Sequence, residues 1–299
     1  MNCKRNLVLL LALAVGASAG LAKADPRRDD GLLMAAYEGQ TPTVRALLAK
    51  GANLETRDGR YGMTPLMWAA WRGQLGTVRY LLAKGAKVNA RGRAGIPMTL
   101  GIGRDYGGFT ETTTEGNMTS WRSVQFKGLI VSESGGVTPL ILAAAGGYGL
   151  TVRELLAKGA DPNLKNPDGD TALMTAAFKG YLPSVQALLA KGADVNAVDK
   201  NNQSALMVAA SQGHLPVVRA LLSKGARAGT KASYGFTASM IARRFGFPSI
   251  AKLLQTAEAK EKVAARQAAK AGTQRKQAIS GQPYTFIDRF SEAAVEFLN

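Results

Sequence analysis

The sequence predicts an all-α repeat solenoid of about six helix-turn-helix units, with a β-hairpin-like insertion and a C-terminal helical tail. Leu-Leu pairs recur at intervals of 34, 74, 33, 33 and 32 residues, from Leu47-Leu48 to Leu253-Leu254. Lys-Gly-Ala triplets keep the same spacing, and so do Thr/Ser-Pro/Ala-Leu triplets that are followed by paired alanines. Three independent motifs with one period indicate stacked repeats, because self-similarity of this length is the signature of a solenoid.

Each element of a unit follows from its residues. Thr or Ser is expected to cap the first helix, as Thr138 does before Pro139, because Pro suits a first turn that needs no backbone donor. Paired alanines such as Ala143-Ala144 let neighbouring helices approach closely. A Gly ends this helix, a second helix follows, and the Gly of Lys-Gly-Ala supplies a left-handed C-cap. Neither helix can bury its apolar face alone, so the units must stack.

This order of motifs resembles the ankyrin repeat family over roughly residues 29–256, apart from one insertion. The resemblance implies six units, at about 29–58, 59–91, 133–165, 166–198, 199–230 and 231–256. The His that such repeats usually carry after Thr-Pro-Leu is replaced, so its hydrogen bonds to the neighbouring backbone are expected to be missing. The replacing residues are Met67, Ile141, Met174 and Met207. The first and last units are atypical, as capping of an exposed stack predicts.

Residues 1–24 are predicted to be a secretion signal. Lys4 and Arg5 precede an apolar run at 7–15, and Ala22-Lys23-Ala24 offers a cleavage site before Asp25. An apolar core of nine residues is too short to span ~30 Å of hydrocarbon. The alternatives are an uncleaved anchor or a buried helix. We therefore expect an exported protein resembling bacterial-type ankyrin repeat proteins, located in the periplasm or, alternatively, secreted outside the cell.

The composition excludes several kinds of site. The chain has 299 residues, a formal net charge of +17, one Cys (Cys3) and one His (His214). An internal disulfide, a multi-Cys metal site and a two-His zinc site are therefore excluded. Removal of the signal leaves a net charge of +14 and no cysteine, which suits an oxidising compartment.

The interval of 74 residues contains about 41 extra residues, which predict an insertion at about 92–132. Thr- and aromatic-rich runs flank a Gly-containing turn there, which is typical of a β-hairpin. A degenerate seventh repeat and a surface loop without a role are the alternatives. Insertions in repeat proteins often map to the binding face.

Residues 257–299 are expected to form a basic helical tail. Gly281-Gln282-Pro283 should end its first helix, and a short amphipathic helix should follow with Phe286, Phe290 and Phe297 on one face. We expect that segment to dock onto the array or onto a partner, and less readily onto a membrane surface.

No catalytic, metal or cofactor site is expected. His214 begins a second helix and is expected to cap it structurally. Gly101-Ile102-Gly103 lacks the Lys-Ser/Thr completion of a phosphate loop. No acid–base pair or nucleophile–base pair is recognisable, so the chain is predicted not to be an enzyme.

Binding is therefore the leading hypothesis. In ankyrin-like units the finger tips and the two positions after the paired alanines are expected to face outward on the concave side, and aromatic residues beside Arg or Lys dominate interface energies. Trp68, one position before the paired alanines, is expected to pack internally. The predicted partner-binding residues are Tyr37, Arg60, Tyr61, Trp71, Arg72, Phe178, Lys179, Gln212 and Tyr234.

The predicted function is an exported protein–protein interaction module that binds another envelope or secreted protein with an acidic surface. A monomer without a transmembrane span is expected. The alternative is adhesion to anionic lipid or cell-wall polymer through the basic tail, a peripheral contact. Nucleic acid is an unlikely partner, because export removes the protein from most of it.

Overall fold

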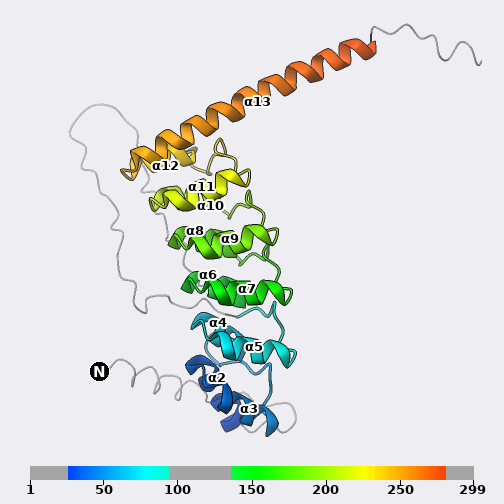
Figure 1. Cartoon of the computed structure of the whole chain (residues 1–299), viewed down its shortest axis with the longest axis vertical. Helices are drawn as coiled ribbons and strands as arrows, with labels where there is room; N and C mark the ends of the chain where they lie inside the picture. Colours follow the sequence, from blue (N-terminus) through cyan, green and yellow to red (C-terminus); the bar gives the residue numbers. More distant parts are fainter. Residues whose placement is uncertain (1–25, 94–135, 281–299) are drawn as a thin grey trace, which may run out of the picture.

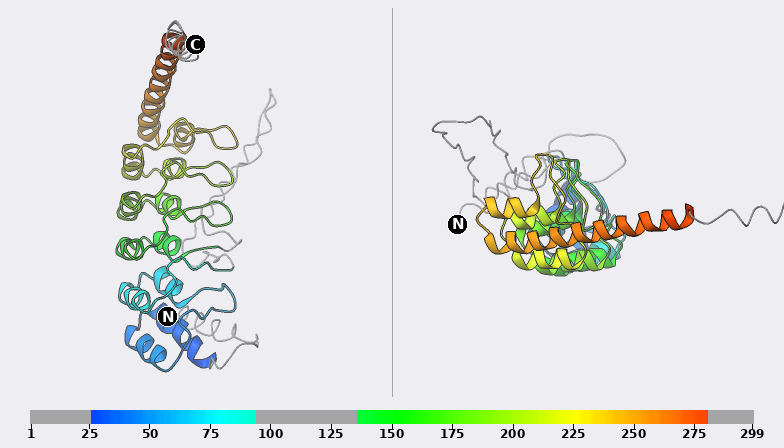
Figure 2. Two further views of the ribbon diagram at one scale, coloured as in Figure 1. Left: turned by 90° about the vertical axis from the view of Figure 1, so that its right-hand side faces the viewer. Right: turned by 90° about the horizontal axis from the view of Figure 1, so that it is seen from above.

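The computed structural model describes residues 26–93 and 136–280, which form an all-α repeat array of twelve helices (Figure 1). Each unit has an inner helix, which follows a loop that we call the finger, and an outer helix behind it (Figure 2). The inner helices are α2 (Pro26–Glu38), α4 (Pro65–Trp71), α6 (Pro139–Gly146), α8 (Ala172–Lys179), α10 (Ala205–Ser211) and α12 (Ala238–Arg244). The outer helices are α3 (Thr41–Ala49), α5 (Leu75–Ala83), α7 (Gly149–Ala157), α9 (Leu182–Ala190), α11 (Leu215–Ser223) and α13 (Pro248–Ser280).

Three predicted features fall wholly or largely outside the described residues. These are the signal at 1–24, positions 94–132 of the hairpin insertion, and the amphipathic segment after residue 281.

The inner helices are capped as the sequence predicts. Thr64, Thr138, Thr171 and Ser204 lie in extended backbone, and each side-chain oxygen accepts a hydrogen bond from the backbone N–H three residues later. The bonds are 3.3–3.4 Å long. In the second unit the Met67 thioether also accepts from the Thr64 N–H at 3.4 Å, so Met67 occupies part of the role that His has in related repeats.

Glycine ends both helices of a unit. Gly85 follows the C-cap residue Lys84 of α5 with φ +89°, and Gly73 ends α4 with φ +68°. Only glycine adopts this left-handed backbone without a steric cost, so the predicted C-caps are confirmed. The C-cap position itself is a Lys at the end of α3, α5, α7, α9 and α11.

The core runs along the inner helices. The paired alanines of α4, α6, α8 and α10 are completely buried. Each inner helix packs against those of the units before and after it, and the outer helices stack in the same way (Figure 2). The small alanine side chains allow this close approach, and Leu and Val side chains from the outer helices complete the core.

An Asn position after the outer helix ties each of the first four units to the next one. Asn89 Nδ2 donates to the Gly159 carbonyl at 3.4 Å, and Asn89 Oδ1 accepts from the Asp161 N–H at 3.0 Å. One amide thus satisfies a carbonyl and an N–H that the end of an outer helix leaves free. The same position makes inter-unit bonds in other units through Glu55, Asn163 and Asn196.

Basic side chains make a second set of inter-unit bonds in the fingers. Arg57 Nη1 donates to the Arg91 carbonyl at 2.7 Å, and Arg91 Nη1 donates to the Lys165 carbonyl at 3.4 Å. Lys165 Nζ donates to the Val198 carbonyl at 2.8 Å. Three of the basic residues therefore stabilise the contacts between neighbouring units.

The residues on either side of positions 94–135 bond to each other, and the stack is continuous there. Gly92 N–H donates to the Val137 carbonyl, and Gly136 N–H donates to the Gly92 carbonyl, both at 2.9 Å. Arg93 N–H donates to the Tyr61 carbonyl of the preceding finger at 2.9 Å. These bonds hold the two flanking segments together, and α6 packs directly on α4.

The last unit differs from the others. Its Thr237 makes no side-chain cap bond and instead pairs with the Ser239 hydroxyl at 3.0 Å. Its outer helix, α13, continues without a break past residue 256, so the predicted boundary between array and tail falls inside one helix. The exposed part of α13 extends beyond the stack (Figures 1 and 2).

Candidate partner-binding surface

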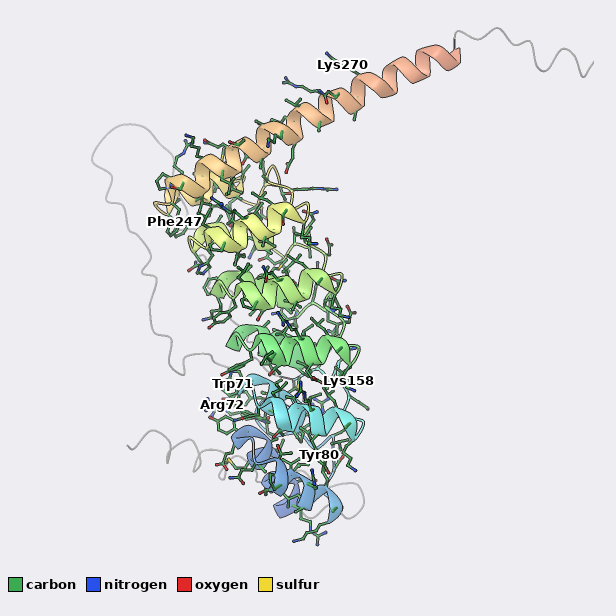
Figure 3. The ribbon with its side chains drawn as sticks, in the orientation of Figure 1. Trp71, Arg72, Tyr80, Lys158, Phe247 and Lys270 are labelled. Carbon is green, nitrogen blue, oxygen red and sulfur yellow. The ribbon has the colours of Figure 1, made fainter. Side chains whose placement is uncertain are left out.

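The predicted binding residues occupy two kinds of position in the units. The ends of the inner helices provide Tyr37, Trp71, Arg72, Phe178, Lys179 and Gln212. The fingers provide Arg60, Tyr61 and Tyr234. Trp71 and Arg72 lie at one edge of the array, opposite the edge at which Lys158 ends α7 (Figure 3).

Four rings form what we call the N-terminal aromatic cluster: Tyr37, Tyr61, Trp68 and Trp71. The Trp68 centroid lies 5.6 Å from Tyr37, 6.2 Å from Tyr61 and 5.4 Å from Trp71. Trp68 is buried, which confirms its predicted packing role, and the other three rings are partly buried around it. Tyr37, Tyr61 and Trp71, which are expected to face outward, are half-buried, because each packs against Trp68 or its neighbours.

A buried carboxylate fixes this cluster on the finger. Asp58 Oδ2 accepts from Trp68 Nε1 and from the Met63 N–H, both at 3.0 Å. Its Oδ1 accepts from the N–H groups of Arg60 and Tyr61. Four donors on one carboxylate hold the finger against α4. Nothing in the sequence analysis singled out Asp58, whose role depends on a Trp ten positions later.

Two exposed cations lie on the aromatic cluster. Arg72 Cζ is 4.9 Å from the centroid of Tyr37, and Arg60 Cζ is 5.2 Å from that of Tyr61. Both guanidinium groups are within the range of a cation–π contact. The cluster therefore presents fixed positive groups backed by partly buried rings.

A second group lies two units further along. Lys179 Nζ is 5.6 Å from the centroid of the partly buried Phe178, and burial lowers the pKa of Lys179. His214 Nε2 lies 2.9 Å from the Phe178 carbonyl. His214 occupies the N-cap position of α11 but makes no cap bond, so the predicted capping role is wrong; its ring bridges to the preceding unit.

The two groups are not continuous. In the third unit the positions equivalent to Trp71 and Arg72 hold Ala145 and Gly146. Ala145 is buried, and a side chain on Gly146 would collide with the Tyr148 ring. No bulky side chain therefore joins the N-terminal aromatic cluster to Phe178 and Lys179.

Gln212 and Tyr234 are bonded within the array. Gln212 Nε2 donates to the Ser211 hydroxyl at 3.2 Å. Tyr234 accepts from Gln203 Nε2, its ring lies 5.8 Å from that of Phe236, and burial raises the pKa of Tyr234 to about 12. Both side chains are partly buried.

The fingers of the fourth and fifth units hold carboxylates with raised pKa values. Burial raises the pKa of Asp170 to about 6, and burial also raises that of Asp199. Asp170 Oδ2 accepts from Asn166 Nδ2 at 3.0 Å. Across the described residues, no group of three or more His, Cys, Asp or Glu side chains is placed to hold a metal ion.

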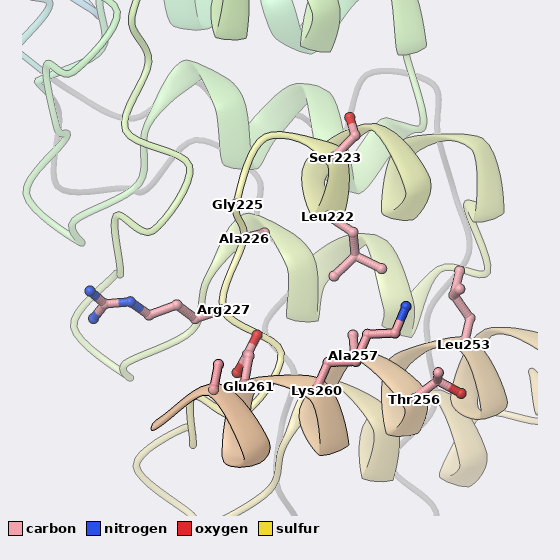
Figure 4. A pocket seen from close by; sticks show the side chains of 11 residues that line it. Leu222, Ser223, Gly225, Ala226, Arg227, Leu253, Thr256, Ala257, Lys260 and Glu261 are labelled. Atoms are coloured by element: carbon pink, nitrogen blue, oxygen red, sulfur yellow. The ribbon is translucent and has the colours of Figure 1, made fainter. Parts of the chain in front are cut away.

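An open groove of about 800 Å³ lies where α13 diverges from α11 (Figure 4). Leu222, Leu253 and Ala257 give it apolar walls, and Arg227 and Lys260 stand at its rim. Glu261 reaches across from α13 and accepts from the backbone of the preceding loop. The groove contains no arrangement for chemistry.

The comparisons with known proteins agree with this architecture. The family model described as "Ankyrin repeats (3 copies)" matches residues 1–92, 124–199 and 194–265. The chain belongs to the ankyrin repeat family. The array is therefore a protein-interaction module of the ankyrin type.

A curated relative is the ankyrin repeat and KH domain-containing protein mask-1 of Caenorhabditis elegans. It is 30% identical over 146 residues, which is 48% of this chain but 5% of the relative. The ankyrin chain thus spans a small part of that protein's length. Among helices within 26–93 and 136–280, none combines the length and hydropathy that crossing a bilayer requires.

Proposed function

We propose that this chain is an exported interaction module, which binds an envelope or secreted protein through the inner-helix and finger face of its ankyrin array. The family membership supports protein binding. The export part rests on the sequence of residues 1–24. An acidic partner surface fits this face, because its cations include the exposed Arg60 and Arg72 and the partly exposed Lys179.

The observation that carries the proposal is the placement of Arg60 and Arg72 over Tyr61 and Tyr37. A cation held against a ring loses little further side-chain freedom when a partner carboxylate pairs with it, which lowers the entropic cost of binding. Arg and aromatic residues are also the types that most often dominate interface energies.

The test is affinity capture from an envelope extract with the intact chain, followed by mass spectrometry. We expect a protein that is retained by wild type, lost with Arg60→Gln/Arg72→Gln, and retained by the outer-helix control Arg153→Gln/Arg219→Gln. The control removes the same charge from exposed positions outside this face. Equal recovery of every protein by both double variants would contradict the proposal.

A second candidate function is adhesion to anionic lipid through the tail. It is favoured by one observation: Lys260, Lys262, Arg266 and Lys270 on α13 are all exposed. Sedimentation with phosphatidylglycerol vesicles, but not with phosphatidylcholine vesicles, would support it, provided that high salt and Lys262→Gln/Arg266→Gln/Lys270→Gln abolish it. Sedimentation that is unaffected by those substitutions would rule it out.

A further inference from the structure

The outer helices carry almost all of their charge with one sign. An Arg recurs at the same helical position in four of them: Arg45, Arg79, Arg153 and Arg219. A Lys recurs at the C-cap: Lys50, Lys84, Lys158, Lys191 and Lys224. On these five helices Glu154 is the single acidic residue, against nine basic ones.

Stacking turns these positions into two parallel columns along the array, at the outer-helix face on which Tyr80 and Lys158 are labelled (Figure 3). Packed helices lie about 8–10 Å apart, so each column repeats at about that distance. The Arg and Lys of one helix are five residues, or about 7.5 Å, apart. All nine basic side chains are exposed.

Few of these charges are neutralised within the described residues. Arg79 Nε pairs with Glu154 at 2.8 Å. Arg45 and Lys84 lie 5.4 and 5.8 Å from the centroid of Tyr80, which keeps their charge and orients it outward. A Lys at a helix C-terminus also suits the helix dipole, but the Arg position lies mid-helix and has no such explanation.

Several carboxylates lie in the loops, where backbone groups use them. Carboxylates of Asp58, Asp161, Asp194 and Asp199 accept hydrogen bonds from N–H groups of the loops. The five outer helices and their C-caps themselves keep an excess of exposed positive charge.

The spacing of the charges and the scarcity of apolar side chains on this face favour one class of anionic ligand over DNA and lipid. Double-stranded DNA carries one charge per ~1.7 Å of axis, far denser than two cations per unit of about 8–10 Å. A bilayer surface is usually met by apolar side chains beside the basic ones, and Leu150 is the one strongly exposed large hydrophobic residue on these helices. A linear chain with charges spaced one or two sugars apart fits both columns.

The geometry points to the outer-helix face as a docking surface for a linear acidic polysaccharide that lies along the stack and pairs with successive Arg and Lys side chains. This surface is separate from the inner-helix and finger face, so a protein partner and the polysaccharide can be bound together.

The test measures binding of the full chain to hyaluronate, a linear polysaccharide with one carboxylate per disaccharide, with uncharged dextran as the control ligand. The variant Arg45→Gln/Arg153→Gln/Arg219→Gln removes three exposed Arg residues, and Gln186 already occupies this position in α9. Lys87→Gln/Lys200→Gln/Lys231→Gln removes the same charge from exposed loop positions and serves as the matched control.

We expect the Arg variant to bind hyaluronate about tenfold more weakly, because each exposed ion pair contributes a fraction of the energy of a tenfold change. The loop variant and an Arg→Lys triple variant should stay within about threefold of wild type, since the first leaves the face intact and the second keeps its charge. Circular dichroism and thermal unfolding establish that each variant is folded.

Four results would overturn the inference. They are equal binding of dextran, an equal loss in the loop variant, a loss confined to Lys262→Gln/Arg266→Gln/Lys270→Gln on α13, and tighter binding of duplex DNA or phosphatidylglycerol vesicles at the same salt concentration.

Discussion

The Glu261 carboxylate of α13 accepts a hydrogen bond from the Ala228 N–H at 2.6 Å, and its other oxygen accepts from Gly229 at 3.0 Å. Earlier in the stack an Asn side chain of the preceding unit bonds to this kind of loop backbone, but Gly229 occupies that Asn position in the fifth unit. Glu261 thus bonds to the loop of the fifth unit from the sixth unit, and this contact anchors α13 to the array.

Glu261→Ala should loosen the tail and the last unit. Hydrogen bonds to a charged group contribute about 1.5–3 kcal/mol each, so we expect a loss of about 2 kcal/mol in local stability. Hydrogen exchange at Ala228 and Gly229 measures it, with Lys262→Ala as the neighbouring control. Because repeats contact only their neighbours, protection in α4 and α6 should not change. Unchanged protection at both loop amides would contradict this role.

Asn163→Ala should uncouple the third unit from the fourth. The side chain bonds to the Gly192 carbonyl at 3.2 Å and to the Asp194 N–H at 2.7 Å, and we expect a loss of about 1–2 kcal/mol in the free energy of unfolding. Asn53→Ala is the matched control, since Asn53 Oδ1 bonds only to the nearby Glu55 N–H. Urea unfolding in which both variants lose the same stability would refute an inter-unit role for Asn163.

Ser184→Ala should stabilise the protein. Ser184 is completely buried and its hydroxyl has no hydrogen-bond partner, whereas Val217 fills the equivalent position one unit later. Removing an unsatisfied buried hydroxyl should add about 1 kcal/mol. Thr77→Val at the same position of the second unit should instead destabilise, because the Thr77 hydroxyl bonds to Thr41 at 2.9 Å. Thermal unfolding distinguishes the two, and a lower melting temperature for Ser184→Ala would disprove the account.

Asp170 should make stability depend on pH. Its folded-state pKa is about 6 against an ordinary value of 3.8, because burial disfavours the charged form. The folded state therefore binds more protons between these values, and stability should fall as pH rises from about 4 to about 6, by at most about 3 kcal/mol. Asp170→Asn keeps an acceptor for Asn166 and should flatten this slope, leaving the contributions of Asp199 and Asp30, whose pKa values burial also raises. Urea unfolding across this pH range gives the slope, and an unchanged slope in the variant would assign the effect to other groups.

Much of the fold could be predicted because its signals are local. Thr138 caps α6 through a bond from the Ile141 N–H three residues later, and Gly85 ends α5 through its own backbone, so each motif indicates its structure without its neighbours. The 33-residue period then fixes how the units stack.

The candidate surface was harder to predict because it depends on contacts between units. Trp71 and Tyr37 are 34 positions apart and bury part of each other, so counting from the paired alanines could not give their exposure. Glu261 and Asn89 act across more than 30 residues. The Arg position of the outer helices is visible in the sequence as a recurring Val-Arg pair, but the alignment of these residues into a column depends on how the units stack.

The most direct test of the central proposal is the dissociation constant of the captured protein partner for wild type and for Trp71→Leu, measured by calorimetry with folding of the variant verified. Truncation of an interface anchor costs on the order of 2 kcal/mol, so we predict binding about 30-fold weaker, with Arg153→Gln/Arg219→Gln close to wild type. Equal affinity of wild type and Trp71→Leu would contradict the proposal that this face binds the partner.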